Sequence, residues 1–136
     1  MPEPHHRQGL VDTSVVIDLE HIDRTNLPSE LAISAVTLAE LAAGPHATAE
    51  PSERARRQDR LQRTEATFEP LPLDRAVARA YGRIYAAVAA AGRKTRGRRA
   101  FDLVIAATAL ANGLPLYTRN PTEFDDLDGL VEVVAV

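Results

Sequence analysis

Four polar residues, far apart in the sequence, have the types and positions that a divalent cation site requires. Asp12 directly follows Gly9-Leu-Val11, a short apolar run that predicts a strand. Glu40 lies in the first turn of the helix predicted after the second strand, and Asp102 lies near the start of an apolar helix that leads into the fourth. Asn120 lies just beyond that fourth strand. Ligands of open parallel sheets bind at the carboxyl ends of the strands, so we expect all four residues at one edge.

The chemistry of this set favours magnesium. Carboxylates at close range raise one another's pKa, and a divalent cation removes that conflict. Oxygen ligands suit Mg²⁺, with Mn²⁺ as the alternative, rather than zinc. The chain has no cysteine, and its few histidines offer no competing ligand set. The pair His5-His6 could grip a metal only weakly, and we interpret it as part of a disordered end.

Each of these residues also has a purely structural interpretation. Thr37-Leu-Ala-Glu40 fits a capping box, in which Glu40 would satisfy a backbone N–H. Asp12 and Asn120 could simply belong to turns, and Asp102 could complement a helix dipole. Asp102, however, borders an apolar run, where an unpaired charge is costly. The coincidence of four such residues therefore favours a shared site.

Strands and helices are predicted to alternate from end to end. The patterns indicate strands at 9–12, 31–35, 68–73, 115–118 and 130–136, and helices at 14–20, 37–43, 51–67, 74–91 and 100–112. This alternation predicts an α/β fold, a three-layer α/β/α arrangement around a mostly parallel sheet of about five strands.

Length and composition indicate one ordinary globular domain. The 136 residues, of which 45% are hydrophobic, form a single predicted domain over 1–136, with 1–8 as a flexible N-terminus. No apolar run approaches the roughly 20 residues of a membrane span, and no signal peptide is visible. We therefore expect a cytoplasmic protein without a membrane partner. The net charge of −3 does not by itself suggest a nucleic-acid binder.

Four motifs together resemble those of a known family. Leu10–Asp18, Ser34–Gly44, Phe101–Ala109 and Leu116–Phe124 carry Asp12, Glu40, Asp102 and Asn120 in that order. This series is similar to the motifs of PIN-domain nucleases, in particular the VapC toxins of prokaryotic toxin–antitoxin pairs. The fourth position is often Asp in that family, whereas here it is asparagine. Glu123 stands where an Asp before Phe is common.

The resemblance implies an Mg²⁺-dependent endoribonuclease that leaves 5′-phosphate and 3′-hydroxyl ends. Asp12 and Asp102 would be direct metal ligands, and Glu40 would be a ligand, directly or through water, or a general base. Thr13 and Ser14 would hydrogen-bond the carboxylates. The resemblance further implies an RNA substrate such as tRNA or rRNA, a homodimer, and a cognate VapB-like antitoxin.

Cations gather just before Asp102, at Arg93, Lys94, Arg96, Arg98 and Arg99. We expect Arg96, Arg98 and Arg99 to form a rim that holds RNA phosphates near an otherwise repellent acidic centre. The alternative is a solvated loop whose charges only moderate the net charge.

Other functions fit the sequence less well. A response-regulator receiver needs a lysine after the last strand, whereas Lys94 precedes a helix. A haloacid-dehalogenase-type phosphatase needs Asp-x-Asp, which Asp12-Thr-Ser14 lacks. The main alternative is a catalytically inactive PIN-fold module that binds RNA or a partner, and the intact Asp12, Glu40 and Asp102 argue against it.

Overall fold

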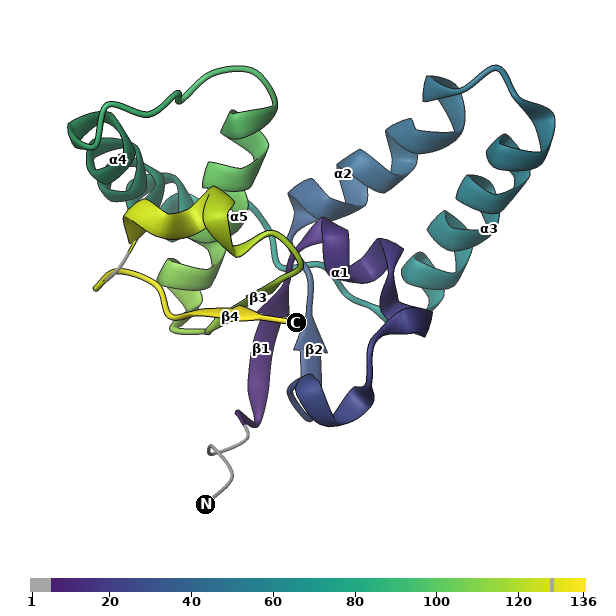
Figure 1. Ribbon diagram of the computed structural model, residues 1–136, viewed down its shortest axis with the longest axis horizontal. Coiled ribbons are helices and arrows are strands. Elements are labelled where there is room, and N and C mark those ends of the chain that lie inside the picture. Colours follow the sequence, from purple (N-terminus) through teal and green to yellow (C-terminus); the bar gives the residue numbers. More distant parts are fainter. Residues whose placement is uncertain (1–5, 128) are drawn as a thin grey trace.

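The computed structural model describes residues 6–127 and 129–136, and these form a parallel sheet with helices on both faces (Figure 1). The strands are β1 (Gln8–Val11), β2 (Glu30–Ala32), β3 (Leu116–Thr118) and β4 (Val133–Ala135), in the order β2-β1-β3-β4. The α-helices are α1 (Thr13–Ile17), α2 (Ala35–Ala43), α3 (Pro51–Thr67), α4 (Arg75–Ala90) and α5 (Arg98–Asn112). The predicted α/β class and parallel sheet are confirmed.

The sheet separates two apolar cores. Side chains of a strand alternate between its faces, so Leu10 and Leu116 pack with α4 and α5, whereas Val11 and Tyr117 pack with α1 and α2. Figure 1 shows α4 and α5 on one side of the strands and α2 and α3 on the other. The carboxyl ends of β1 and β3 thus lie between two helical layers, where α1, α2 and α5 meet.

The segment 68–73, predicted as a strand, contributes only one bridge. Leu71 pairs with Ser34, and its backbone bonds Ile33 and Ala35. Pro70 and Pro72 flank it, and because proline has no N–H, the ladder cannot extend in either direction. The described residues therefore give four strands in the sheet rather than about five.

The long helices begin and end close to their predicted bounds. The predicted helix 51–67 coincides with α3. Asp74 caps α4 as expected, because its side chain accepts the N–H of Val77 at 3.0 Å. Arg57 ties α3 to the end of α2 through a 2.9 Å bond to the Gly44 carbonyl.

The predicted flexible N-terminus, residues 1–8, can be compared with the structure only from residue 6 onward. Residues 1–5 of the expected flexible segment lie outside the described part of the chain, whereas Gln8 already belongs to β1 and pairs with Glu30. Within the described residues, no helix has the length and apolar character to cross a membrane.

Candidate active site

Asp12 lies between β1 and α1 and is almost fully buried. One carboxylate oxygen accepts the backbone N–H of Thr13 at 2.7 Å, which makes Asp12 the N-cap of α1. The other oxygen accepts the hydroxyls of Ser14 at 2.9 Å and Thr118 at 2.8 Å. Three donors on one carboxylate fix its orientation at the carboxyl end of β1.

Glu40 extends from α2 towards the same place. The Thr13 hydroxyl donates to Glu40 Oε1 at 2.7 Å and lies 3.0 Å from the hydroxyl oxygen of the buried Thr37. Thr13, the first residue of α1, therefore contacts both acids. Its backbone N–H donates to Asp12, and its hydroxyl donates to Glu40.

The alternative interpretation of Glu40 as part of a capping box is wrong. The N-cap of α2 is Ser34, whose side chain accepts the N–H of Val36 at 3.0 Å. Glu40 consequently lies in the second turn rather than the first, too far along α2 to cap it. Its carboxylate contacts α1 instead of its own helix end.

Asp102 is half-buried on α5, within electrostatic reach of the other acids. Its pKa rises from the ordinary 3.8 to about 6, chiefly because burial removes water from the carboxylate. The negative charges of Asp12, Glu123 and Glu40 raise the pKa further, and Arg99 opposes them. The fold thus gathers the three predicted acids from β1, α2 and α5 around one acidic centre.

Asn120 is exposed just after β3, and the structure connects it to this centre through its backbone. Its N–H donates to the Thr118 hydroxyl at 3.0 Å, and that hydroxyl donates to Asp12. Thr118 is a supporting residue that sequence reasoning missed. The available signal was a polar residue inside the fourth motif, at the end of an apolar strand and two residues before Asn120.

The acidic side chains suit a divalent cation chemically but do not form a ready-made metal site. Among the described residues, no group of three or more His, Cys, Asp or Glu side chains is placed to hold a metal ion. Repulsion nevertheless raises the pKa of Asp102, since charge interactions act over longer distances than coordination. A cation would relieve that repulsion, and the donors are all oxygens. It therefore remains a prediction that metal ligands are provided by Asp12, Glu40 and Asp102.

The raised pKa of Asp102 predicts a pH-dependent stability of the metal-free protein. A carboxyl group whose pKa is higher in the folded state stabilises the fold below its unfolded pKa, and this contribution is lost as pH rises through the folded value. We expect the Tm difference between Asp102→Asn and wild type, measured with chelator present, to widen in favour of the variant from about pH 4 to about pH 7. A difference that stays constant over this range would contradict the raised pKa.

The basic loop differs from the predicted rim. Arg96 is exposed, as expected, and nothing is described of the Arg98 side chain. Arg99 instead points inward, with only 9% of its side chain exposed, and its Nη1 donates to Glu123 at 2.7 Å. Glu123, whose role the sequence left open, is therefore the partner of Arg99. Contact of these arginines with RNA remains a prediction.

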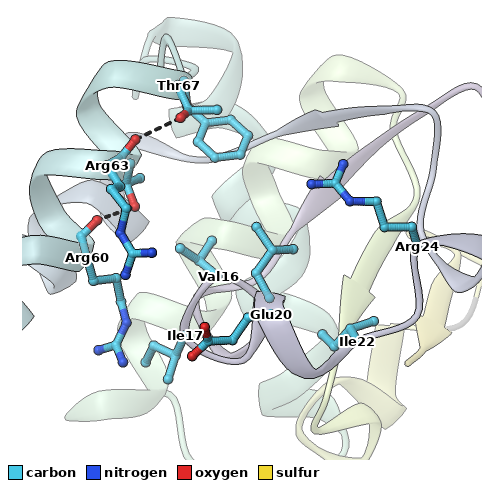
Figure 2. Close-up of a pocket in the computed structure, with 11 residues that line it drawn as sticks. Val16, Ile17, Glu20, Ile22, Arg24, Arg60, Arg63 and Thr67 are labelled. Carbon is cyan, nitrogen blue, oxygen red and sulfur yellow. Dashed lines mark hydrogen bonds between the residues drawn. The ribbon is translucent and has the colours of Figure 1, made fainter. Parts of the chain in front are cut away.

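Two cavities flank α1. One, of about 450 Å³, lies between α1 and α3 and contains none of the predicted site residues. Figure 2 shows Val16 and Ile17 facing Arg60 and Arg63 across it. The other, of about 500 Å³, lies between α1, α2 and α3, where Thr13 and Glu40 line it together with the half-exposed Phe101. Of the three predicted acids, only Glu40 lines it.

Known proteins are similar to this chain in sequence and in fold. Residues 9–130 match the PIN domain. The chain is 38% identical to Ribonuclease VapC5 of Mycobacterium tuberculosis over 133 residues, 94% of this chain and 95% of that protein. Ribonuclease VapC4 of the same organism is 35% identical over 117 residues, covering 84% and 87% of the two chains.

The fold also matches the crystal structure of VapBC-5, a member of the VapBC family of toxin–antitoxin systems from M. tuberculosis. The TM-score is 0.84 at 38% identity, over 96% of this chain and 99% of that one. These matches span the four motifs and confirm the resemblance drawn from them. The chain belongs to the PIN domain family.

Proposed function

We propose that this protein is a metal-dependent endoribonuclease, the toxin of a VapBC-type toxin–antitoxin pair. It hydrolyses RNA phosphodiester bonds and leaves 5′-phosphate and 3′-hydroxyl ends. The observation that carries the proposal is the intact acidic centre of Asp12, Glu40 and Asp102, in a chain 38% identical to Ribonuclease VapC5 over 94% of its length.

The chain's own residues have distinct parts in this reaction. Asp12 and Asp102 would hold Mg²⁺, or Mn²⁺ in its place, with Glu40 as a further ligand or as the general base. When bound, the cation supplies positive charge to the scissile phosphate and acidifies a water molecule. Thr13 orients the Glu40 carboxylate, and Thr118 orients that of Asp12. Such supporting hydrogen bonds tune the ligands they hold.

The proposal extends to the substrate, the oligomeric state and the protein partner of the enzyme. The substrate is a cellular RNA, with tRNA or rRNA as the first candidates, and the protein acts in the cytoplasm as a homodimer. A VapB-like antitoxin holds it in check, as the VapBC composition of the matched structure suggests. One domain over 1–136 carries the whole activity.

A catalytically inactive module that binds RNA or a partner is the remaining alternative. Such a module has no need for three acids that repel one another, because an unneutralised acidic cluster destabilises the fold. Burial and the negative charges of Asp12, Glu123 and Glu40 together raise the pKa of Asp102, and a site that bears this cost favours the enzyme. A cleavage assay decides between the two.

Purified protein should cut RNA only when a divalent cation is present. We expect a chelator to abolish cleavage, Mg²⁺ or Mn²⁺ to restore it, and sequencing of the cut ends to find 5′-phosphates. In cells, induction should produce the same ends, and co-expression of the neighbouring small gene's product should suppress them. Equal cutting by wild type and Asp12→Asn preparations would show that the acidic centre does not carry the activity and would overturn the proposal.

A further inference from the structure

Helix α1 carries the residue that contacts two of the predicted acids, but it is too short to be stable alone. Thr13, its first residue, donates its backbone N–H to Asp12 and its hydroxyl to Glu40, each at 2.7 Å. The helix has only five residues, whereas isolated helices shorter than about 12 residues are marginal in water. Its last three residues, 15–17, are β-branched, which lowers the helix propensity further. Contacts with the rest of the fold must therefore hold α1 in place.

Apolar packing holds the inner face of α1 better than its C-terminal end. Val15 is fully buried and Val16 is 6% exposed, so this face is fixed in the core. Ile17, the last residue of the helix, is in contrast 42% exposed and borders the cavity between α1 and α3 (Figure 2). The C-terminal end of α1 therefore depends on polar contacts for its position.

Arg119, the first residue after β3, contacts α1 at both ends. Its backbone N–H donates to the Ser14 hydroxyl oxygen at 3.2 Å, and its Nε lies 3.3 Å from a carboxylate oxygen of Asp18. Ser14 and Asp18 are four residues apart, so they lie on the same side of the helix, about 6 Å apart along its axis. Arg119 thus spans α1 from its second residue to its C-cap residue.

The same contacts lead directly to Asp12. The Ser14 hydroxyl, which accepts the N–H of Arg119, donates to Asp12 at 2.9 Å. Thr118, which precedes Arg119, donates to the same carboxylate oxygen at 2.8 Å. Release of Asp18 would let α1 rotate and tilt, and the hydroxyls of Thr13 and Ser14 would then point in other directions. A misplacement of about 1 Å at a reacting centre is enough to slow an enzyme strongly.

We propose that the ion pair between Arg119 and Asp18 holds α1 in the orientation that the acidic centre requires. Both are then positioning residues for RNA cleavage, which act through Thr13 and Ser14 rather than by contact with RNA. Two other roles of the pair predict different results. If Arg119 contacted RNA, Asp18 would compete for its charge, so removal of Asp18 would strengthen RNA binding. If the pair were only a solvated surface contact, its removal would change nothing.

This inference rests on the proposed ribonuclease function and is tested with Asp18→Asn, Arg119→Gln and the double variant. We expect each single variant to lower kcat about fivefold at saturating Mg²⁺, a modest effect because the two side chains are partly exposed. The KM for an oligoribonucleotide should change by less than about twofold, since no RNA contact is lost. The double variant should be no slower than the slower single variant, because either substitution alone breaks the pair.

A second measurement requires neither metal nor RNA. The N–H groups of Val15 and Val16 donate to the Asp12 carbonyl, so their hydrogen exchange reports the opening of α1. In the metal-free protein, both single variants should exchange these amides about threefold faster or more. The Tm should change little, because the pair is partly exposed.

Matched variants control for charge alone. Glu20→Gln and Arg24→Gln remove exposed charges just beyond α1, and both should leave kcat and exchange within about 1.5-fold of wild type under salt screening. Arg119→Lys retains a cation that can pair with Asp18, so its kcat should stay within about twofold of wild type. An Arg119→Lys enzyme as slow as Arg119→Gln would contradict the role of the ion pair.

Three further outcomes would overturn the inference. Arg119→Gln could raise the KM and flatten its salt dependence while Asp18→Asn lowers the KM, which would assign Arg119 to RNA binding. The two losses in kcat could add in the double variant, or exchange of the α1 amides could stay unchanged. A wild-type protein that cuts no RNA rejects the proposed function, whereas amide exchange still decides whether Arg119 and Asp18 hold α1.

Discussion

Replacing either Asp12 or Asp102 with asparagine should abolish RNA cleavage by the purified protein. Each substitution removes one negative charge from the set that would hold the cation and leaves the side-chain shape almost unchanged. A metal ion contributes several kcal/mol to stabilising the charge of the transition state, so we expect a loss of about a thousandfold or more. Cleavage of a labelled oligoribonucleotide in Mg²⁺, together with the Tm of each variant, measures the effect.

The two variants should differ in stability although both lose activity. Asp102 is half-buried among like charges, so its neutralisation should raise the Tm of the metal-free protein at neutral pH. Asp12 accepts three hydrogen bonds, and an amide cannot accept all of them equally, so Asp12→Asn should leave the Tm unchanged or lower it. Asp125→Asn, an exposed acid two residues after Glu123 in the sequence, is the matched control for cleavage. Near wild-type cutting by either site variant would refute the assignment.

Glu40→Gln should reduce cleavage about 100-fold while the fold remains intact, which is the range expected for loss of acid–base help. Glutamine retains the oxygen that accepts the Thr13 hydroxyl but can neither take a proton nor carry a charge. Because Ser34 rather than Glu40 caps α2, the Tm should change little. Rate measurements at saturating Mg²⁺ and at saturating RNA separate catalysis from binding.

Glu69→Gln, an exposed carboxylate beyond the end of α3, serves as the control for this substitution. A fully active Glu40→Gln enzyme would show that the contact with Thr13 is structural. Rescue of the variant's rate by higher Mg²⁺ would instead identify Glu40 as a metal ligand rather than a general base.

Features that depend on local sequence were predictable from the chain alone. The start of α4 at Asp74 and the full extent of α3 follow from capping and helix-forming residues a few positions apart. Connectivity also brought Asp12, Glu40 and Asp102 to one edge, because parallel strands share their direction. In contrast, Ser34 and Thr37 are both acceptable caps, so local pattern could not decide the register of α2.

Features that depend on tertiary contacts were not predictable. The bond from Thr118 to Asp12 requires β3 to lie directly beside β1, which no local pattern specifies. The inward turn of Arg99 depends in the same way on Glu123, which lies 24 residues further along the chain. The charged run around Arg99 resembles any solvated loop until that partner is in place. Contacts between residues far apart in the sequence, rather than composition, determine the positions of Thr118 and Arg99.

The bond between Asp12 and Thr118 spans 106 residues, and it has a consequence for how the protein is made. Asp12 leaves the ribosome early, but Asp102 and Thr118 belong to the last third of the chain, and β3 must pair with β1 before the centre is complete. Domains fold as units as synthesis proceeds from the N-terminus. A nascent chain therefore lacks a complete acidic centre until translation is nearly finished.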